Sequence, residues 1–290
     1  MAKTRLLAAK PSIEAYFAQS PLTAFRRSEI IAMVEANRAS WRLPKSMSFS
    51  DFFRFMTEKS QLKRVALKFP SRCETRFVFG EIPVYAVAYS LKPDSYFTHY
   101  TAMHIHHLTD QVPKTIYLNS EQPPKLKGSG SLSQVRIDAA FRRPPRASKS
   151  IATVTGFRIC LLNGMHTGGL GVTESTAPDG SAIRVTGLER TLIDIAVRPF
   201  YAGGVFEILR AYRKTGGEAS VNKISAMLKT LEYVYPYHQA IGYYLEASGY
   251  PQSAIALLDE FPKKHDFYLT HQIKNPAYSP KWRLYFPKGL

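Results

Sequence analysis

The segment from Ser46 to Gly80 constrains the fold of this chain more than any other part of the sequence. Ser48 and Asp51 form the S-x-x-D pattern of a capping box, which satisfies free backbone N–H groups at the start of a helix. Apolar residues then follow at positions i, i+3, i+4 and i+7: Phe49, Phe52, Phe53 and Met56. This spacing predicts an amphipathic helix with one continuous buried stripe.

The residues that follow this helix predict a β-hairpin. The stretches 62–67 (LKRVAL) and 75–80 (TRFVFG) have a β-prone composition, and the turn between them carries Lys68 and Arg72. Two more helices are expected before the capped one, over 11–19 with Ser12 at its N-cap and over 28–37 with Ser28 at its N-cap. Three helices followed by a basic hairpin is the element order of a winged helix-turn-helix domain.

The charge of the chain is high and unevenly distributed. The net charge is +17, and residues 1–80 hold 15 Lys and Arg against 6 Asp and Glu, while residues 81–290 hold 24 against 16. A strongly basic chain indicates a polyanionic partner, with nucleic acid first and an anionic membrane surface as the rival. The charge density predicts that this partner binds the first 80 residues.

The same helix and hairpin supply the candidate contacts to double-stranded DNA. Outward side chains of a helix in the major groove contact base edges, and flanking cations neutralise phosphates. The base-contact candidates are Ser50, Arg54, Thr57 and Gln61, and the other candidates are Lys45, Ser46, Lys59, Lys63, Arg64, Lys68, Arg72 and Arg76. The alternative is a solvated charged surface on a small structural domain.

The rest of the chain predicts a mixed α/β domain. We expect the DNA-binding domain over 1–82 and the second domain over 83–290, which makes the whole protein α+β. Strands are expected over 84–90, 114–119, 182–187, 266–270 and 282–286, and helices over 95–108, 188–197, 202–214, 220–232, 236–248 and 252–260. Thr186 and Glu189 form a second capping-box pattern before the helix at 188–197, whose buried face is predicted to carry Leu188, Leu192 and Ile195.

Several chemical sites are not supported by the residue patterns. Four histidines lie close together without sharing a helix face: His99, His104, His106 and His107. The stretch 167–175 lacks the GK[ST] of a phosphate loop and is expected to be a turn, and Arg190 with Asp194 is expected to be an ordinary i,i+4 pair. We therefore expect no enzyme, no metal site and no cofactor.

Two further features of the sequence predict where in the cell the protein is located. The chain has no run of 18 apolar residues, and its cysteines, Cys73 and Cys160, form no CxxC pair. Both features predict a cytoplasmic protein that does not span a membrane.

Three segments carry a resemblance to a known family: 95–125, with "THYTAMHIHHLT", 185–204, with "ERTLID", and 235–250. In these segments the chain resembles the AbiEi-type antitoxins of type IV toxin–antitoxin and phage-defence systems, with Thr98 where Ser is commoner. The resemblance implies an N-terminal winged helix that represses its own operon at inverted repeats. It also implies a C-terminal domain that neutralises a nucleotidyltransferase-like toxin encoded nearby, and a signature that keeps His99 and His106 without a metal.

Two other functions remain open: a stand-alone DNA-binding regulator without a toxin partner, and an enzyme whose site is not recognisable from the sequence. A toxin reading frame next to the gene favours the antitoxin over the regulator. A tightly bound metal or nucleotide in the purified protein favours the enzyme.

Overall fold

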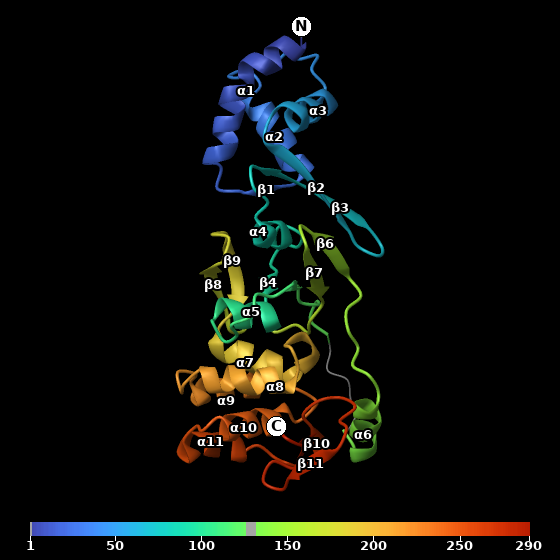
Figure 1. Cartoon of the computed structure of the whole chain (residues 1–290), viewed down its shortest axis with the longest axis vertical. Helices are drawn as coiled ribbons and strands as arrows, with labels where there is room; N and C mark the ends of the chain where they lie inside the picture. Colours follow the sequence, from blue (N-terminus) through green and yellow to red (C-terminus); the bar gives the residue numbers. More distant parts are fainter. Residues whose placement is uncertain (1, 126–131) are drawn as a thin grey trace. The chain divides into compact units, whose positions relative to one another are not determined.

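The computed structural model describes residues 2–125 and 132–290 and confirms the α+β class (Figure 1). The chain forms two compact units. The first comprises Met1–Asp94, Lys149–Cys160 and Thr176–Ile183, and the second comprises Ser95–Ser148, Leu161–Ser175 and Arg184–Leu290. The first unit therefore extends past the predicted boundary at residue 82 and includes two short segments from far along the chain.

The first unit begins with helix α1 (Ala2–Gln19), strand β1 (Ala24–Phe25) and helix α2 (Arg27–Asn37). The N-caps predicted for these helices are wrong. Ser12 lies inside α1, directly after Pro11. The N-cap of α2 is Arg26, whose backbone N–H donates to Glu29 Oε2 at 2.6 Å, so the helix starts at Arg27. Ser28 is therefore inside the helix and is not its N-cap.

Helix α3 (Phe49–Lys59) is formed as predicted. The backbone N–H of Asp51 donates to Ser48 Oγ at 3.1 Å, so Ser48 is the N-cap. The predicted stripe packs into one apolar core together with α1, α2 and the start of the hairpin, and Phe55 is buried there as well. Its larger members are Ile13, Phe17, Ile30, Val34, Trp41, Phe52, Phe53, Met56, Leu62 and Phe77.

The predicted hairpin is also present, as strands β2 (Leu62–Lys68) and β3 (Cys73–Phe79). They pair in register from Leu62 with Phe79 to Lys68 with Cys73, and β1 adds to β3 to complete a three-stranded antiparallel sheet. Strand β6 (Ile151–Val154), which forms a hairpin with β7 (Phe157–Leu162), runs next to β2 within the same unit. This packing explains why residues 149–160 belong to the first unit.

Residues 84–90 do not form the predicted strand. They form helix α4 (Val84–Tyr89), in which Val84, Val87 and Ala88 are buried on one side. A spacing of three and four residues is that of a helix face, so packing of this face overrides the β-prone composition.

The second unit combines a sheet with a helical layer (Figure 1). Its strands follow the order β7-β5-β4-β9-β8, and the strands not yet defined are β4 (Tyr96–Phe97), β5 (Thr115–Asn119), β8 (Val172–Thr176) and β9 (Ala182–Thr186). A smaller sheet near the C-terminus contains β10 (Phe267–Tyr268), β12 (Leu284–Pro287) and β11 (Pro276–Ser279), in that order. The helices are α5 (His99–Ile105), α6 (Gln134–Arg142), α7 (Leu188–Val197), α8 (Val205–Lys214), α9 (Val221–Leu231), α10 (Tyr237–Ala247) and α11 (Gln252–Asp259), with a 3-10 turn η1 (Pro199–Tyr201).

The predicted helices from α8 to α11 are confirmed, whereas α6, β6, β7 and β11 were not predicted. Helix α7 packs against α5, α8, α9 and α10 and lies within the apolar core of the second unit. Leu192 and Ile195 are fully buried as predicted, and Leu188 is half-buried. The polar residues Arg190 and Asp194 are buried on the same helix, so α7 is enclosed around most of its circumference.

The second predicted capping box is wrong. The N-cap of α7 is Gly187, and the Thr186 hydroxyl is instead hydrogen-bonded to the Thr191 hydroxyl at 2.8 Å. Glu189 accepts from the backbone N–H of Ser220 at 3.2 Å, which ties α7 to the start of α9. Within 2–125 and 132–290, no helix combines the length and hydropathy needed to cross a bilayer.

Candidate nucleic-acid interface

The outward face of α3 carries the side chains that the sequence predicts for base contacts. Ser50, Arg54 and Thr57 are exposed on the helix, and Gln61 is exposed just after it. The opposite face is held in the core of the first unit, so the amphipathic pattern determines which side chains point outward. Lys45 and Ser46, which precede the helix, and Lys59 in its last turn are exposed as well.

Two of these side chains are hydrogen-bonded within α3. An Arg54 terminal nitrogen donates to Asp51 Oδ1 at 2.5 Å, although the Arg54 side chain is 69% exposed. The Thr57 hydroxyl donates to the carbonyl of Phe53 at 2.8 Å. An exposed i,i+3 ion pair contributes little to stability, so Arg54 can exchange this contact for another acceptor at small cost.

The hairpin adds a second group of cations. Lys63, Arg64 and Lys68 are exposed on β2, and Arg64 and Lys68 share one face of the strand by alternation. Within the described residues, no carboxylate forms an ion pair with Lys45, Lys59, Lys63, Arg64 or Lys68. These five side chains are available to bind phosphate groups.

Arg72 lies at the tip of the hairpin, just before β3. Its Nε donates to Glu74 Oε1 at 2.9 Å, and its guanidinium lies over the Phe69 ring at 5.3 Å from the centroid. Arg72 remains exposed, so its position agrees with the predicted surface role.

The prediction that Arg76 is a surface cation is wrong, because only 4% of this residue is exposed. Its Nε and one terminal nitrogen donate to the hydroxyl and carbonyl oxygens of Ser90, at 2.9 and 3.1 Å. The other terminal nitrogen donates to the carbonyl of Thr75 at 2.8 Å. Arg76 therefore connects β3 to the end of α4 and is not available to DNA. Burial lowers its pKa below the ordinary value for arginine, although the neighbouring Glu74 opposes this shift.

The first unit also contains a basic hollow of about 500 Å³ that was not predicted from the sequence. Its cations include Arg26, Arg27 and Lys92, and Glu74 is the carboxylate on its wall. Arg27 lies over the Phe53 ring at 4.6 Å from the centroid, so its position is coupled to the core beneath α3. The adjacent arginines at positions 26 and 27 were the signal available in the sequence, but they were not among the predicted contact residues.

The signature segments of the second unit meet in the structure although they are about 90 residues apart in sequence. Asp194 Oδ2 accepts from the Thr98 hydroxyl at 2.9 Å, and Asp194 Oδ1 accepts from Arg190 Nε at 2.8 Å. Burial by itself would lower the pKa of Arg190, but the adjacent Asp194 carboxylate raises it above the ordinary value.

The four histidines near α5 do not converge on one point. His99 is buried, and burial lowers its pKa to about 4, whereas His106 Nε2 lies 2.6 Å from the carbonyl oxygen of Thr186. Among the residues that the structure describes, no three His, Cys, Asp or Glu side chains form a group able to hold a metal ion.

The glycine-rich turn at 167–171 binds a carboxylate of the protein itself. Glu121 accepts the backbone N–H groups of Thr167, Gly168 and Gly169 at 2.7 to 3.3 Å, and both glycines have positive φ. Burial would raise the pKa of Glu121, but hydrogen bonds from the Thr167 hydroxyl, the backbone of Thr167 and Gly169, and the Tyr96 hydroxyl hold this pKa below the ordinary value. The predicted turn is confirmed up to Gly171, whereas residues 172–175 form part of strand β8. The backbone N–H groups of residues 167–169 are already occupied by Glu121.

Comparison with known proteins leaves the family open. No protein-family model and no curated protein sequence matches the chain. Among solved structures, the chain is similar to the RV2827C protein from Mycobacterium tuberculosis, with a TM-score of 0.62 and 13% sequence identity. The match covers 97% of this chain and 91% of that one. At this identity the likeness shows that the two chains share a fold.

Proposed function

We propose that this protein is a DNA-binding antitoxin that acts in the cytoplasm. In this proposal the N-terminal helices and the β2–β3 hairpin form a winged helix-turn-helix, which represses the protein's own operon at inverted repeats. The second unit neutralises a nucleotidyltransferase-like toxin encoded nearby. The observation that supports DNA binding best is the set of exposed cations on α3 and β2 that have no carboxylate partner among the described residues.

The arrangement of side chains suits this role. Helix α3 presents the polar side chains of Ser50 and Arg54 on its exposed face, where they can hydrogen-bond to base edges in a major groove. Lys63, Arg64 and Lys68 on the hairpin would neutralise phosphates beside the groove. The antitoxin role rests on the family resemblance of the segments around Thr98 and Asp194, which the fold brings together.

DNA affinity should depend steeply on salt. If about six phosphates are neutralised, the slope of log K against log salt is expected near −5. The measurement is a fluorescence-anisotropy titration of the full-length protein with its own promoter fragment at several salt concentrations. The full chain is required because residues 149–160 and 176–183 belong to the first unit. An affinity that is indifferent to salt would refute the electrostatic interface.

Arg54→Ala should reduce the discrimination between promoter DNA and random DNA by about 1–3 kcal/mol, because Arg54 is proposed to read a base edge. Lys63→Ala is the matched control. Loss of one phosphate contact should weaken binding to both DNAs equally and make the salt slope shallower by about 1. Equal losses on both DNAs for Arg54→Ala would assign Arg54 to a phosphate instead.

Neutralisation should not require DNA binding. Cells that express the adjacent toxin gene are expected to grow when the full-length protein is co-expressed. The Arg54→Ala/Lys63→Ala/Arg64→Ala variant should protect them equally while it fails to repress the promoter. If the wild-type protein represses the promoter but gives no protection, the stand-alone regulator replaces the antitoxin as the function of this chain.

A further inference from the structure

A cavity of about 340 Å³ in the second unit lies where the signature segments meet. Its wall includes the start of α5, the end of β5, one side of α7 and the loop 232–237, which connects α9 to α10 and ends at Tyr237, the first residue of α10. This volume is in the range of pockets that hold a single small molecule. The DNA interface proposed on α3 and the β2–β3 hairpin does not use this cavity.

Most of the polar wall is fixed by hydrogen bonds within the protein. Both Asp194 oxygens accept hydrogen bonds, from Arg190 and from Thr98. A terminal nitrogen of Arg190 donates to the carbonyl of Leu170 at 2.6 Å. Asn119 accepts from the backbone N–H of Gly164 at 2.9 Å and donates to the Tyr96 hydroxyl at 2.8 Å. The acceptors of this wall are therefore largely engaged, and its shape is preorganised.

Two nitrogen groups on the wall have no partner among the described residues. Only 6% of His99 is exposed, and its Nδ1 makes no hydrogen bond there. The half-buried guanidinium of Arg198, at the end of α7, forms neither a hydrogen bond nor an ion pair with a described side chain or carbonyl group. A buried polar group without a partner is uncommon in a folded protein, so His99 Nδ1 indicates that a hydrogen-bonding partner is missing from the cavity. The half-buried Arg198 guanidinium on the same wall can donate to such a partner.

His99 is also held in an unusual backbone conformation. Its φ of +53° lies in the left-handed region, which residues other than glycine seldom adopt. Strained positions of this kind cluster at ligand-binding sites. The His99 ring makes an edge-to-face contact with the Tyr201 ring, and the two ring centroids are 5.3 Å apart.

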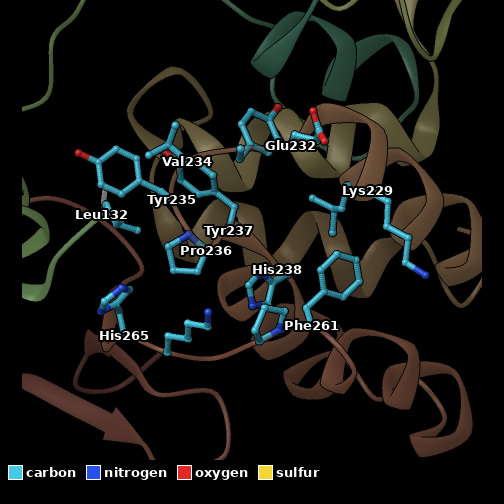
Figure 2. A pocket seen from close by; sticks show the side chains of 14 residues that line it. Leu132, Lys229, Glu232, Val234, Tyr235, Pro236, Tyr237, His238, Phe261 and His265 are labelled. Atoms are coloured by element: carbon cyan, nitrogen blue, oxygen red, sulfur yellow. The ribbon is translucent and has the colours of Figure 1, made fainter. Parts of the chain in front are cut away.

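The loop 232–237 supplies aromatic rings. Tyr233, Tyr235 and Tyr237 all line the cavity, and the ring centroids of Tyr233 and Tyr237 are 5.2 Å apart. Burial raises the pKa of Tyr237 to about 12, so its hydroxyl remains protonated at neutral pH. The same loop borders a second, larger hollow of about 710 Å³, with Tyr235 on one side and Lys229 and Phe261 on the other (Figure 2).

The chemistry of the wall selects one class of ligand. The Arg198 guanidinium is a permanent cationic donor, and neutral His99 donates from Nδ1 in the tautomer that carries the proton there. Together they favour an anionic acceptor such as phosphate and disfavour a cation. The tyrosine rings favour a planar ring on the same molecule. Glu232, the other carboxylate on the wall, is exposed at the end of α9 and leaves the inner part of the cavity basic.

We propose that this cavity binds a small phosphorylated molecule with a planar ring, of the kind represented by a nucleoside monophosphate. Arg198 and His99 bind the phosphate, and the tyrosines of the loop 232–237 pack against the ring.

The test is isothermal titration calorimetry of the full-length protein with AMP, GMP, CMP and UMP in turn. At least one of them is expected to bind. The corresponding nucleoside and inorganic phosphate alone should each bind at least about tenfold more weakly. The nucleoside lacks the phosphate that Arg198 and His99 bind, and inorganic phosphate lacks the ring that the tyrosines pack against. Arg198→Met should weaken binding of the same nucleotide at least about tenfold, because a charge-assisted hydrogen bond is lost. This variant should fold, because the Arg198 guanidinium has no partner among the described residues.

Arg210→Met is the matched control, because Arg210 lies on α8, outside the cavity, and is highly exposed. It should leave affinity unchanged. Tyr233→Leu tests the ring independently and should weaken nucleotide binding without changing the weak binding of inorganic phosphate. The proposal is overturned if none of the four nucleotides binds at millimolar concentration. It is also overturned if inorganic phosphate binds as tightly as the nucleotides, or if Arg198→Met binds like the wild type.

Discussion

Asp194→Ala is expected to destabilise the protein by about 3–5 kcal/mol, because it leaves a buried guanidinium without its counter-charge. The side chains of Arg190 and Asp194 are only 5% and 9% exposed, and their closest atoms are 2.8 Å apart. The Thr98 hydroxyl would lose its acceptor in the same step. The free energy of unfolding from urea denaturation, followed by near-ultraviolet circular dichroism, measures the effect.

The control for this variant is Asp110→Ala, which removes an exposed ion pair in the same unit. Asp110 pairs with Lys214, and its side chain is 93% exposed, so the loss should stay below about 1 kcal/mol. The double variant Arg190→Met/Asp194→Leu removes both charges and should recover much of the stability lost by Asp194→Ala. If Asp194→Ala were no more destabilising than Asp110→Ala, the pair would contribute only what an exposed helix pair does.

Leu192→Ala is expected to cost about 2–5 kcal/mol, because it creates a cavity in the centre of the second unit. Leu192 is fully buried in the apolar core on α7, which α5, α8, α9 and α10 surround. The neighbouring helices are held by their own core contacts, so the site can collapse only in part. Thermal and urea unfolding of the purified variant, compared with the wild type, provide the measurement.

Val135→Ala is the matched control for Leu192→Ala, since it also shortens an aliphatic side chain on a helix of the second unit. Val135 is largely exposed on α6, so its truncation should change stability by no more than about 0.5 kcal/mol. A loss below about 1 kcal/mol for Leu192→Ala would mean that α7 is not a central packing element.

Local signals in the sequence determined much of the first unit. Ser48 predicted the start of α3 because the cap and the first turn form from adjacent residues. The stripe of Phe52, Phe53 and Met56 predicted which face is buried, and so which side chains are left for a partner. The hairpin and helices α8 to α11 were predictable for the same reason, because their periodicity and turns lie within short stretches of chain.

The tertiary structure decided what depends on residues far apart in the chain. Strand alternation places Arg76 on the face opposite to the core residue Phe77, yet Ser90 at the end of α4 accepts its hydrogen bonds and Arg76 is buried. Residues 84–89 form a helix because one side of them is buried, although their composition favours a strand. The first unit includes residues 149–160 because β6 runs next to β2, which no composition change near residue 82 could indicate.

The buried pair of Arg190 and Asp194 in the second unit also depends on residues far apart in the chain. The sequence determined that Arg190 and Asp194 lie one helical turn apart, and this spacing alone is worth a few tenths of a kcal/mol at a surface. Only the fold places Thr98 and His99 around this pair and removes most of the pair from water. Away from water, the attraction between two charges is stronger, and a polar group without a partner costs more free energy. Burial depends on how the whole chain packs, so no local stretch of sequence determines it.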